Sequence, residues 1–257
     1  MTVVGISFVG QCHTVGYAGV PADAAFPRVC RGAIEAARPG TRVEVKLQPC
    51  FHPAELVPSV RAALRSAPHV IIIEAPGWLA VAGTPSVDLS RLPKSLRSAY
   101  DRVKHFRHVS RAILRDAPRA ADLVTRVDTQ LGTAGRALLR PLLPRHARPS
   151  VAEYERCLAD ALALVVAAPS TRAVVQGPGA PNMSIDPRSV ASDLPQRFVA
   201  VREMARRVAD QHGALFVDRW DTITKNFYSD ASPRPSAEGH SIFGQLLAAE
   251  LLQAGFV

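Results

Sequence analysis

The chain has 257 residues, of which 47% are hydrophobic and 21% charged, as is usual for a soluble globular protein. No apolar run approaches the roughly 18 residues of a membrane-spanning helix, and the first residues include no basic segment like that of a signal peptide. We therefore expect a cytoplasmic protein. The four cysteines are widely spaced and form no CxxC pair, which argues against structural zinc and a disulfide framework.

The net charge of +9 comes from one segment. Residues 91–148 contain fourteen lysines and arginines against four aspartates, whereas the rest of the chain carries a net charge of only −1. Such a basic face binds an anionic partner, lies on an anionic membrane surface, or is simply solvated, and all three interpretations stay open. Nucleic acid is not expected, because the segment has no interleaved aromatic residues and no recognised binding motif.

The first part of the chain alternates short apolar runs with amphipathic segments. Apolar runs bounded by glycine or proline are typical of buried strands, and apolar residues at helical spacing are typical of helices. In chain order these patterns predict a strand at 3–9, a helix at 26–37, a strand at 42–47, a helix at 53–65 and a strand at 69–73. The last of these is a continuous β-branched run, which is typical of a central parallel strand.

The same alternation returns after the basic segment. It predicts a helix at 151–167, a strand at 173–176, a helix at 196–211, a strand at 214–217 and a helix at 236–254. This order predicts an α/β fold, a three-layer α/β/α sandwich with a mostly parallel, flavodoxin-like sheet. Ligands of such sheets bind beyond the carboxyl ends of the strands, so the loops that follow the strands are the expected site.

The basic segment interrupts this pattern. Its helical periodicity and its proline breaks predict two or three helices between residues 89 and 149. We therefore expect one domain, residues 1–257, that carries a basic helical insertion at about 89–149.

The most informative stretch follows the first predicted strand. It reads Phe8-Val9-Gly10-Gln11-Cys12-His13-Thr14-Val15-Gly16-Tyr17. Gly10 permits a tight turn, and the chain then starts toward a helix, so backbone N–H groups near residue 12 can face a developing oxyanion. A helix N-terminus also lowers the pKa of a thiol and raises its thiolate fraction. Cys12 is therefore the predicted nucleophile.

This stretch resembles the first sequence block of the SGNH, or GDSL-like, hydrolases, where a strand leads into Gly-Asp-Ser-Leu-Thr and then Gly-Tyr. Gly10, Thr14, Gly16 and Tyr17 keep the places of that block, and Cys12 stands at the nucleophilic serine. The resemblance implies the SGNH hydrolase fold and acyl chemistry through a covalent intermediate.

The end of the chain resembles the last block of the same family. It reads Pro235-Ser236-Ala237-Glu238-Gly239-His240, and His240 matches the family's second histidine, which has a structural role. Arg234 stands at the place of the catalytic histidine. Ala231 stands at that of the aspartate, with Asp230 beside it. A standard triad cannot be assembled from these places, so a base has to be sought elsewhere.

Three residues at the expected edge of the sheet are candidates for this base. His52 follows the second strand, and His13 is adjacent to Cys12. Glu74 ends a buried strand, where an ionised carboxylate needs a partner. It orients a histidine, acts as a base with a raised pKa, or forms a salt bridge, for example with an arginine of the insertion. These alternatives stay open, as does the absence of a histidine base.

Other polar residues near this edge are candidates for oxyanion or substrate hydrogen bonds. After the third strand the chain keeps Gly77, and Trp78 stands near the family's oxyanion asparagine. The candidates are Gln11, Gln48, Gly77, Trp78, Asn182 and Arg234. The chain has no P-loop, no GxGxxG fingerprint and no HExxH motif, so neither a cofactor nor a metal is expected.

The insertion and the residues at 149–154 resemble an actinobacterial branch of the superfamily that includes the diglucosylglycerate octanoyltransferases. That resemblance implies acyl transfer, from a thioester or ester donor to a hydroxyl or amine of a small molecule. A basic cap suits an anionic donor such as acyl-CoA or the phosphopantetheine arm of an acyl-carrier protein. The predicted activity is thus that of a biosynthetic acyltransferase, or of an esterase or thioesterase.

Two other functions remain open. An enzyme that keeps the pocket without covalent catalysis would be a cyclase or lyase, with Glu74, His13 or His52 as acid and base. A non-catalytic binding protein would also account for the missing histidine and aspartate.

Overall fold

The computed structural model describes residues 1–10, 20–50, 52–75, 150–180, 194–222 and 235–257, and all of these belong to one compact unit. The predicted basic insertion at about 89–149 lies outside the described residues. The single domain with an inserted cap therefore stays a prediction.

One parallel sheet forms the centre of the described unit. Its strands are β1 (Thr2–Gly10), β2 (Thr41–Pro49), β3 (Val70–Glu74), β4 (Arg172–Gln176) and β5 (Leu215–Val217). Their order is β2-β1-β3-β4-β5, and every pairing is parallel. The direction of strand succession reverses between β1 and β3, which is where doubly wound sheets bind their ligands.

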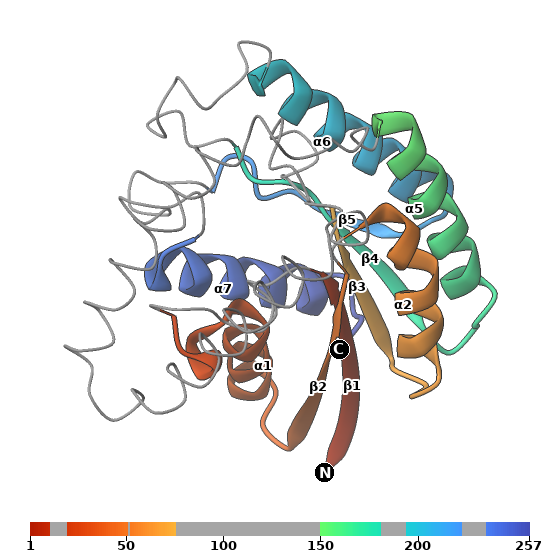
Figure 1. Cartoon of the computed structure of the whole chain (residues 1–257). Coiled ribbons are helices and arrows are strands. Elements are labelled where there is room, and N and C mark those ends of the chain that lie inside the picture. The colour runs from red at the N-terminus through yellow and green to blue at the C-terminus, as the bar shows by residue number, and fades with distance from the viewer. Residues whose placement is uncertain (11–19, 51, 76–149, 181–193, 223–234) are drawn as a thin grey trace, which may run out of the picture. The chain divides into compact units, whose positions relative to one another are not determined.

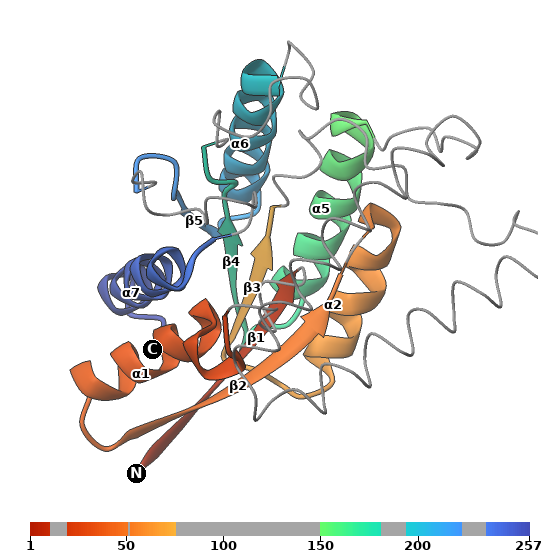
Figure 2. The same ribbon diagram turned by 60° about the vertical axis from the view of Figure 1, so that its left-hand side comes forward.

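Helices cover both faces of this sheet, as Figures 1 and 2 show. One face is covered by α1 (Phe26–Ala37) and α7 (Ala237–Gln253), which pack against each other. The other face is covered by α2 (Leu56–Leu64), α5 (Val151–Val166) and α6 (Leu194–Gln211). The predicted three-layer α/β/α sandwich with a parallel sheet is confirmed.

The element boundaries agree with the sequence patterns to within a few residues, with one correction. The helix predicted at 53–65 is a 3₁₀ turn, Pro53–Glu55, followed by α2. His52 ends the preceding loop and caps this turn, which fixes its start. Elsewhere serine side chains cap the helix starts: Ser150 accepts from the N–H of Glu153, and Ser236 from the N–H of Gly239.

Alternation along the strands divides the apolar core into two clusters. Ile71 and Ile73 point toward α2, α5 and α6, whereas Val70 and Ile72 point toward α1 and α7. By the same alternation Glu74 points toward α1 and α7, at the carboxyl end of β3.

The layer of α1 and α7 is packed closely. Phe26 lies with its ring centroid 5.7 Å from that of Phe8 and 4.5 Å from that of Phe243. Gly244 permits the approach of the two helices, because a Cβ atom there would lie 2.6 Å from Cβ of Val29 and 2.8 Å from the carbonyl oxygen of Phe26. This packing holds α7 firmly under the sheet.

Hydrogen bonds close the amino ends of the central strands. Nδ1 of His69 accepts from the N–H of Gly5 at 3.0 Å, and the N–H of His69 donates to the carbonyl of Gly5 at 2.8 Å. The hydroxyl of Thr171 donates to the carbonyl of Pro68 at 2.8 Å. Polar groups at this end of the sheet are thus paired with one another.

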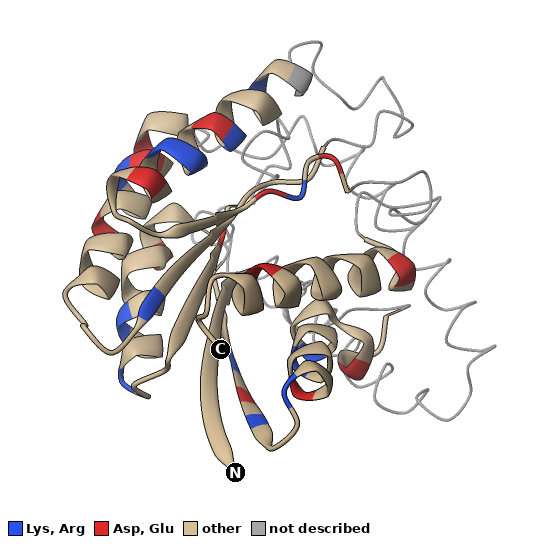
Figure 3. Cartoon of the chain, turned by 180° about the vertical axis from the view of Figure 1, so that it is seen from behind, with Lys and Arg blue, Asp and Glu red and all other residues tan. Residues whose placement is uncertain are grey.

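Most charged residues of the described part lie on the helices and along β2, and others lie at the ends of β3 and β4 and after β5, while β1 carries none (Figure 3). None of the helices in this part combines the length and apolar character that crossing a bilayer requires. Nor do three His, Cys, Asp or Glu side chains gather in the described ranges as metal ligands would.

Candidate functional site

The five strands are parallel, so their last residues, Gly10, Pro49, Glu74, Gln176 and Val217, lie at the same end of the sheet. β1 ends at Gly10, whose carbonyl accepts from the N–H of Cys50 at 2.7 Å. The loop after β2 is therefore tied to the end of β1.

The structure describes three of the ten predicted site residues. Gln48, His52 and Glu74 lie in described segments. The others, Gln11, Cys12, His13, Gly77, Trp78, Asn182 and Arg234, lie outside the described residues, and their roles stay predictions.

His52 has a local structural task. Its Nδ1 accepts from the N–H of Ala54 at 3.2 Å, and its own N–H donates to the Glu55 carboxylate at 3.1 Å. These two bonds form a capping box at the start of the 3₁₀ turn. A neutral imidazole that accepts at Nδ1 carries its proton on Nε2, so in this position the ring presents a donor to its surroundings.

Gln48 and Glu74 lie on opposite faces of the sheet. Gln48 pairs in register with Val9, which packs in the cluster under α2, α5 and α6. Glu74 pairs in register with Gln176, one residue beyond Ile73, and so faces α7. The two predicted site residues are therefore not brought together on one face.

Glu74 forms a buried ion pair. Its Oε1 lies 3.1 Å from Nη2 of Arg219, and the two side chains are 2% and 7% exposed. The Arg219 guanidinium also lies over the ring of Phe243 in α7, with Cζ 4.6 Å from the ring centroid. A salt bridge is one of the alternatives expected for Glu74, and its described partner is an arginine that follows β5, outside the insertion.

Gln176, the last residue of β4, was not a candidate in the sequence analysis. It is fully buried beside Glu74, and neither its Oε1 nor its Nε2 has a hydrogen-bond partner in the structure as described. Nε of Arg219 is likewise buried without a partner. The sequence did contain a signal for Gln176, because it is a polar residue at the end of an apolar strand, as Glu74 is.

Arg219 was also missed, and its neighbour explains how it is held. Asp218 accepts bonds from Nε of Arg202 at 3.1 Å, from Nη2 of Arg202 at 2.5 Å, and from Arg206. These arginines belong to α6, so Asp218 binds the segment after β5 to that helix, while the guanidinium of Arg219 lies over Phe243 of α7. Burial raises the pKa of Asp218, but bonds from Arg202 and the N–H of Trp220 outweigh it and leave the pKa lowered.

Solved structures share this architecture over almost the whole chain. A lipase/acylhydrolase from Enterococcus faecalis is 12% identical, with a TM-score of 0.59 and coverage of 98% of this chain and 96% of the other. Est24, a carbohydrate acetylesterase from Sinorhizobium meliloti, is 10% identical, with a TM-score of 0.57 and coverage of 98% and 99%. A protein described as an SGNH hydrolase, from Slackia heliotrinireducens, is 14% identical, with a TM-score of 0.53 and coverage of 97% and 100%.

The chain has the fold of the SGNH hydrolases. No protein-family model matches the sequence, and no curated protein matches it either. The likeness therefore lies in the arrangement of strands and helices and does not by itself transfer an activity.

His240 has a structural position in this SGNH fold. It is fully buried, and its Nδ1 accepts from the N–H of Phe26 at 3.0 Å. Its ring stacks on that of Phe26 with the centroids 6.0 Å apart. His240 thereby joins the first turn of α7 to the start of α1, in agreement with the structural role that the sequence resemblance implies.

The three described cysteines are free thiols whose pKa values are all raised. Burial raises the pKa of Cys30 to about 12. Burial, followed by the nearby Glu55 carboxylate, raises the pKa of Cys50 to about 11. The pKa of Cys157 is raised too, chiefly by burial. Since the thiolate is the nucleophile, none of these three is suited to attack a carbonyl at neutral pH.

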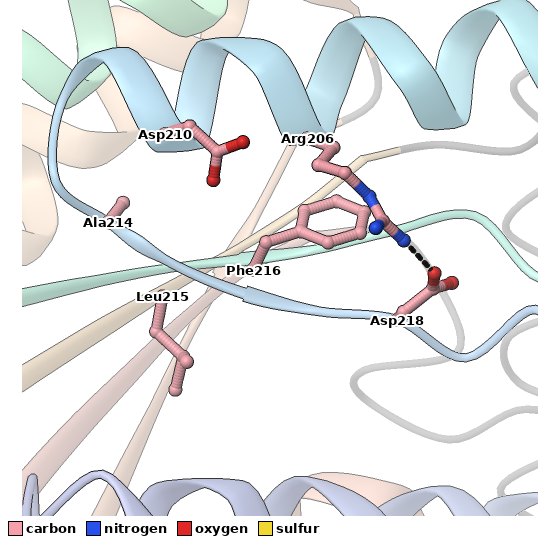
Figure 4. Close-up of a pocket in the computed structure, with 6 residues that line it drawn as sticks. All are labelled: Arg206, Asp210, Ala214, Leu215, Phe216 and Asp218. Carbon is pink, nitrogen blue, oxygen red and sulfur yellow. Dashed lines mark hydrogen bonds and ion pairs between the residues drawn. The ribbon is translucent and has the colours of Figure 1, made fainter.

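A pocket in the described residues lies beside the outer edge of β5 (Figure 4). Residues of α6 and β5 line it, and the pair of Arg206 and Asp218 spans one end. Glu74 and Gln176 do not line the pocket. The pocket is therefore distinct from the polar cluster at the ends of β3 and β4.

Proposed function

We propose that the protein is an acyl-handling enzyme of the esterase and acyltransferase type, with Cys12 as its nucleophile. The observation that carries this proposal is the SGNH fold with Gly10 at the carboxyl end of β1, because Cys12 follows it by two residues. That edge is where sheets of this order bind their ligands. The raised pKa values of the three other cysteines are compatible with Cys12 as the reactive thiol.

The reaction runs in two halves. The Cys12 thiolate attacks the carbonyl carbon of an ester or thioester, and the tetrahedral oxyanion collapses to an acyl-thioester while the donor's alkoxide or thiolate leaves and takes up a proton. A hydroxyl or amine of a small acceptor then loses its proton to a base, attacks the thioester carbonyl and expels the Cys12 thiolate. Backbone N–H groups near residue 12 and Gly77 are the proposed oxyanion donors.

Of the two predicted histidine bases, we propose His13. Nδ1 of His52 accepts the N–H of Ala54, which keeps the proton of the neutral ring on Nε2. Such a ring donates a hydrogen bond to an acceptor group more readily than it removes a proton. An anionic donor, acyl-CoA or an acyl-carrier protein, remains the proposed partner of the basic insertion.

Intact-mass measurement tests the proposal directly. Incubation with acetyl-CoA, octanoyl-CoA and p-nitrophenyl acetate is expected to add one acyl group to the wild type and none to Cys12→Ala. Turnover of the ester should fall about 10³-fold or more in Cys12→Ala, as for loss of a nucleophile elsewhere. Cys50→Ala is the matched control, because burial raises the pKa of the Cys50 thiol to about 11, and this variant should keep both adduct and turnover.

Iodoacetamide labelling at different pH values gives a second, substrate-free readout. The labelling of Cys12 should reach half its maximum below pH 8.5, about the value of an unperturbed thiol. Cys50 should label only as pH approaches about 11, the pKa that its burial produces. Full turnover by Cys12→Ala, with no adduct on the wild type, would leave the acid–base enzyme or the binding protein as the better interpretation.

A further inference from the structure

The ends of β3 and β4 carry more buried hydrogen-bonding atoms than the ion pair of Glu74 and Arg219 satisfies. Glu74 and Arg219 form one charge-assisted contact at 3.1 Å. Beside them the amide of Gln176 is fully buried with both its oxygen and its nitrogen unpartnered, and Nε of Arg219 is an unpartnered donor. Three hydrogen-bonding atoms in the described part are thus taken out of water without compensation.

Such groups are costly to a fold. A buried amide without partners loses its hydrogen bonds to water, whereas a leucine side chain in its place has no such bonds to lose. Native proteins satisfy most buried polar atoms, so a cluster of unsatisfied atoms requires an explanation such as a ligand group that completes it. The cluster lies at the carboxyl edge of the sheet, where the ligand of this fold is expected.

We infer that Gln176, Glu74 and Arg219 form a polar subsite that binds a neutral donor–acceptor group of the substrate. The opposite charges of Glu74 and Arg219 are already paired, so the subsite offers a charged group no free countercharge. Oε1 of Gln176 requires a donor, whereas its Nε2 and Nε of Arg219 require acceptors. Adjacent hydroxyls of a polyol and a carboxamide both present this combination of donors and acceptors.

We assign the bound neutral group to the acyl acceptor, and this assignment rests on the proposed function. An acceptor with several hydroxyls would place one pair in the subsite and a further hydroxyl toward the acyl-thioester on Cys12. Binding at the subsite is nevertheless measurable without any chemistry, so the two proposals fail separately.

The binding experiment uses the full chain as Cys12→Ala, labelled with ¹⁵N. The side-chain NH₂ signals of Gln176 are identified by their loss in Gln176→Leu. Titration with glycerol or with acetamide, each a neutral probe, is expected to shift these signals saturably. Comparison of the two probes shows whether the subsite prefers adjacent hydroxyls or a carboxamide. Acetate and ethylammonium are the charged probes of matched size, and neither should produce a saturable shift.

Stability and kinetics complete the test. Gln176→Leu should unfold at the same urea concentration as the wild type or a higher one, because it removes unsatisfied atoms. In the active enzyme the same change should raise KM for the acceptor at least tenfold and leave the rate of Cys12 acylation unchanged. Ser7→Ala is the matched control, since the Ser7 hydroxyl is buried and unpartnered but lies within β1 on the opposite face, and its KM should not change.

Three results would overturn the inference. No saturable shift with either neutral probe, tighter binding of a charged probe, or clear destabilisation by Gln176→Leu would each show that the cluster is structural. Absence of an acyl adduct on Cys12 would instead remove the proposed function and leave the binding result readable.

Discussion

The two ends of the parallel sheet are built differently. At the amino end, His69 and Thr171 pair with backbone groups of Gly5 and Pro68. At the carboxyl end, the buried side chains of Gln176 and Arg219 keep atoms without partners. The end whose polar groups form hydrogen bonds with one another contributes stability, whereas the end with unsatisfied polar groups is suited to binding a ligand.

Among substitutions that test this difference between the two ends, Arg219→Met is expected to change the free energy of unfolding most. Removal of the guanidinium leaves the Glu74 carboxylate buried without its described cation, which should cost about 3–5 kcal/mol of the free energy of unfolding. Urea denaturation measures it. Arg42→Met is the control, because Arg42 and Glu44 pair on the surface with side chains 62% and 50% exposed, and its effect should stay within about 1 kcal/mol. Equal effects would contradict the assignment of a buried pair.

A smaller effect is expected at the opposite end from Thr171→Val. The change keeps the shape of the side chain but removes the buried hydrogen bond to the Pro68 carbonyl, at a cost of about 1–2 kcal/mol. Ser66→Ala removes a partly buried bond to the Ala63 carbonyl and should cost less. If Thr171→Val stabilised the protein, as Gln176→Leu is expected to do, the two ends of the sheet would not differ in how their polar groups affect stability.

The smallest effect concerns Asp218, and it depends on pH. Because the pKa of Asp218 is lowered in the folded protein, its contribution is present above its ordinary value of 3.8 and is lost as pH falls through the folded value. Asp218→Asn should lose about 1 kcal/mol at pH 7, a modest amount because solvent screens this partly exposed cluster. Unfolding midpoints at pH 7 and at a series of pH values descending below 3.8 should show that the difference from the wild type shrinks progressively in acid.

The sequence predicted the described fold well because its signals were local. Glycine and proline bound the apolar runs, and serine side chains mark the starts of α5 and α7, so the element ends were correct to within a few residues. The 3₁₀ turn before α2 was missed. His52-Pro53-Ala54-Glu55 does contain its signal, an acceptor followed three residues later by glutamate.

The candidate site was predictable only in part, because contacts across strands are not local. The need of Glu74 for a cation followed from its place in a buried strand, but the identity of Arg219 depended on the pairing of β4 with β5. Gln176 could have been found by the reasoning applied to Glu74, since both are polar residues that end apolar strands. Their common face becomes apparent only when the register of β3 and β4 is known.

The segment after β5 joins two layers of the molecule through consecutive residues. Asp218 is bound to α6, and Arg219 reaches Glu74 and α7 on the other face of the sheet. Because Asp218 and Arg219 are consecutive, a shift of α6 that moves Asp218 also moves the backbone that carries the buried guanidinium. A chimera that imports α6 from another protein of this fold therefore has to keep an arginine at position 202 as the partner of Asp218, or Arg219 loses its alignment with Glu74.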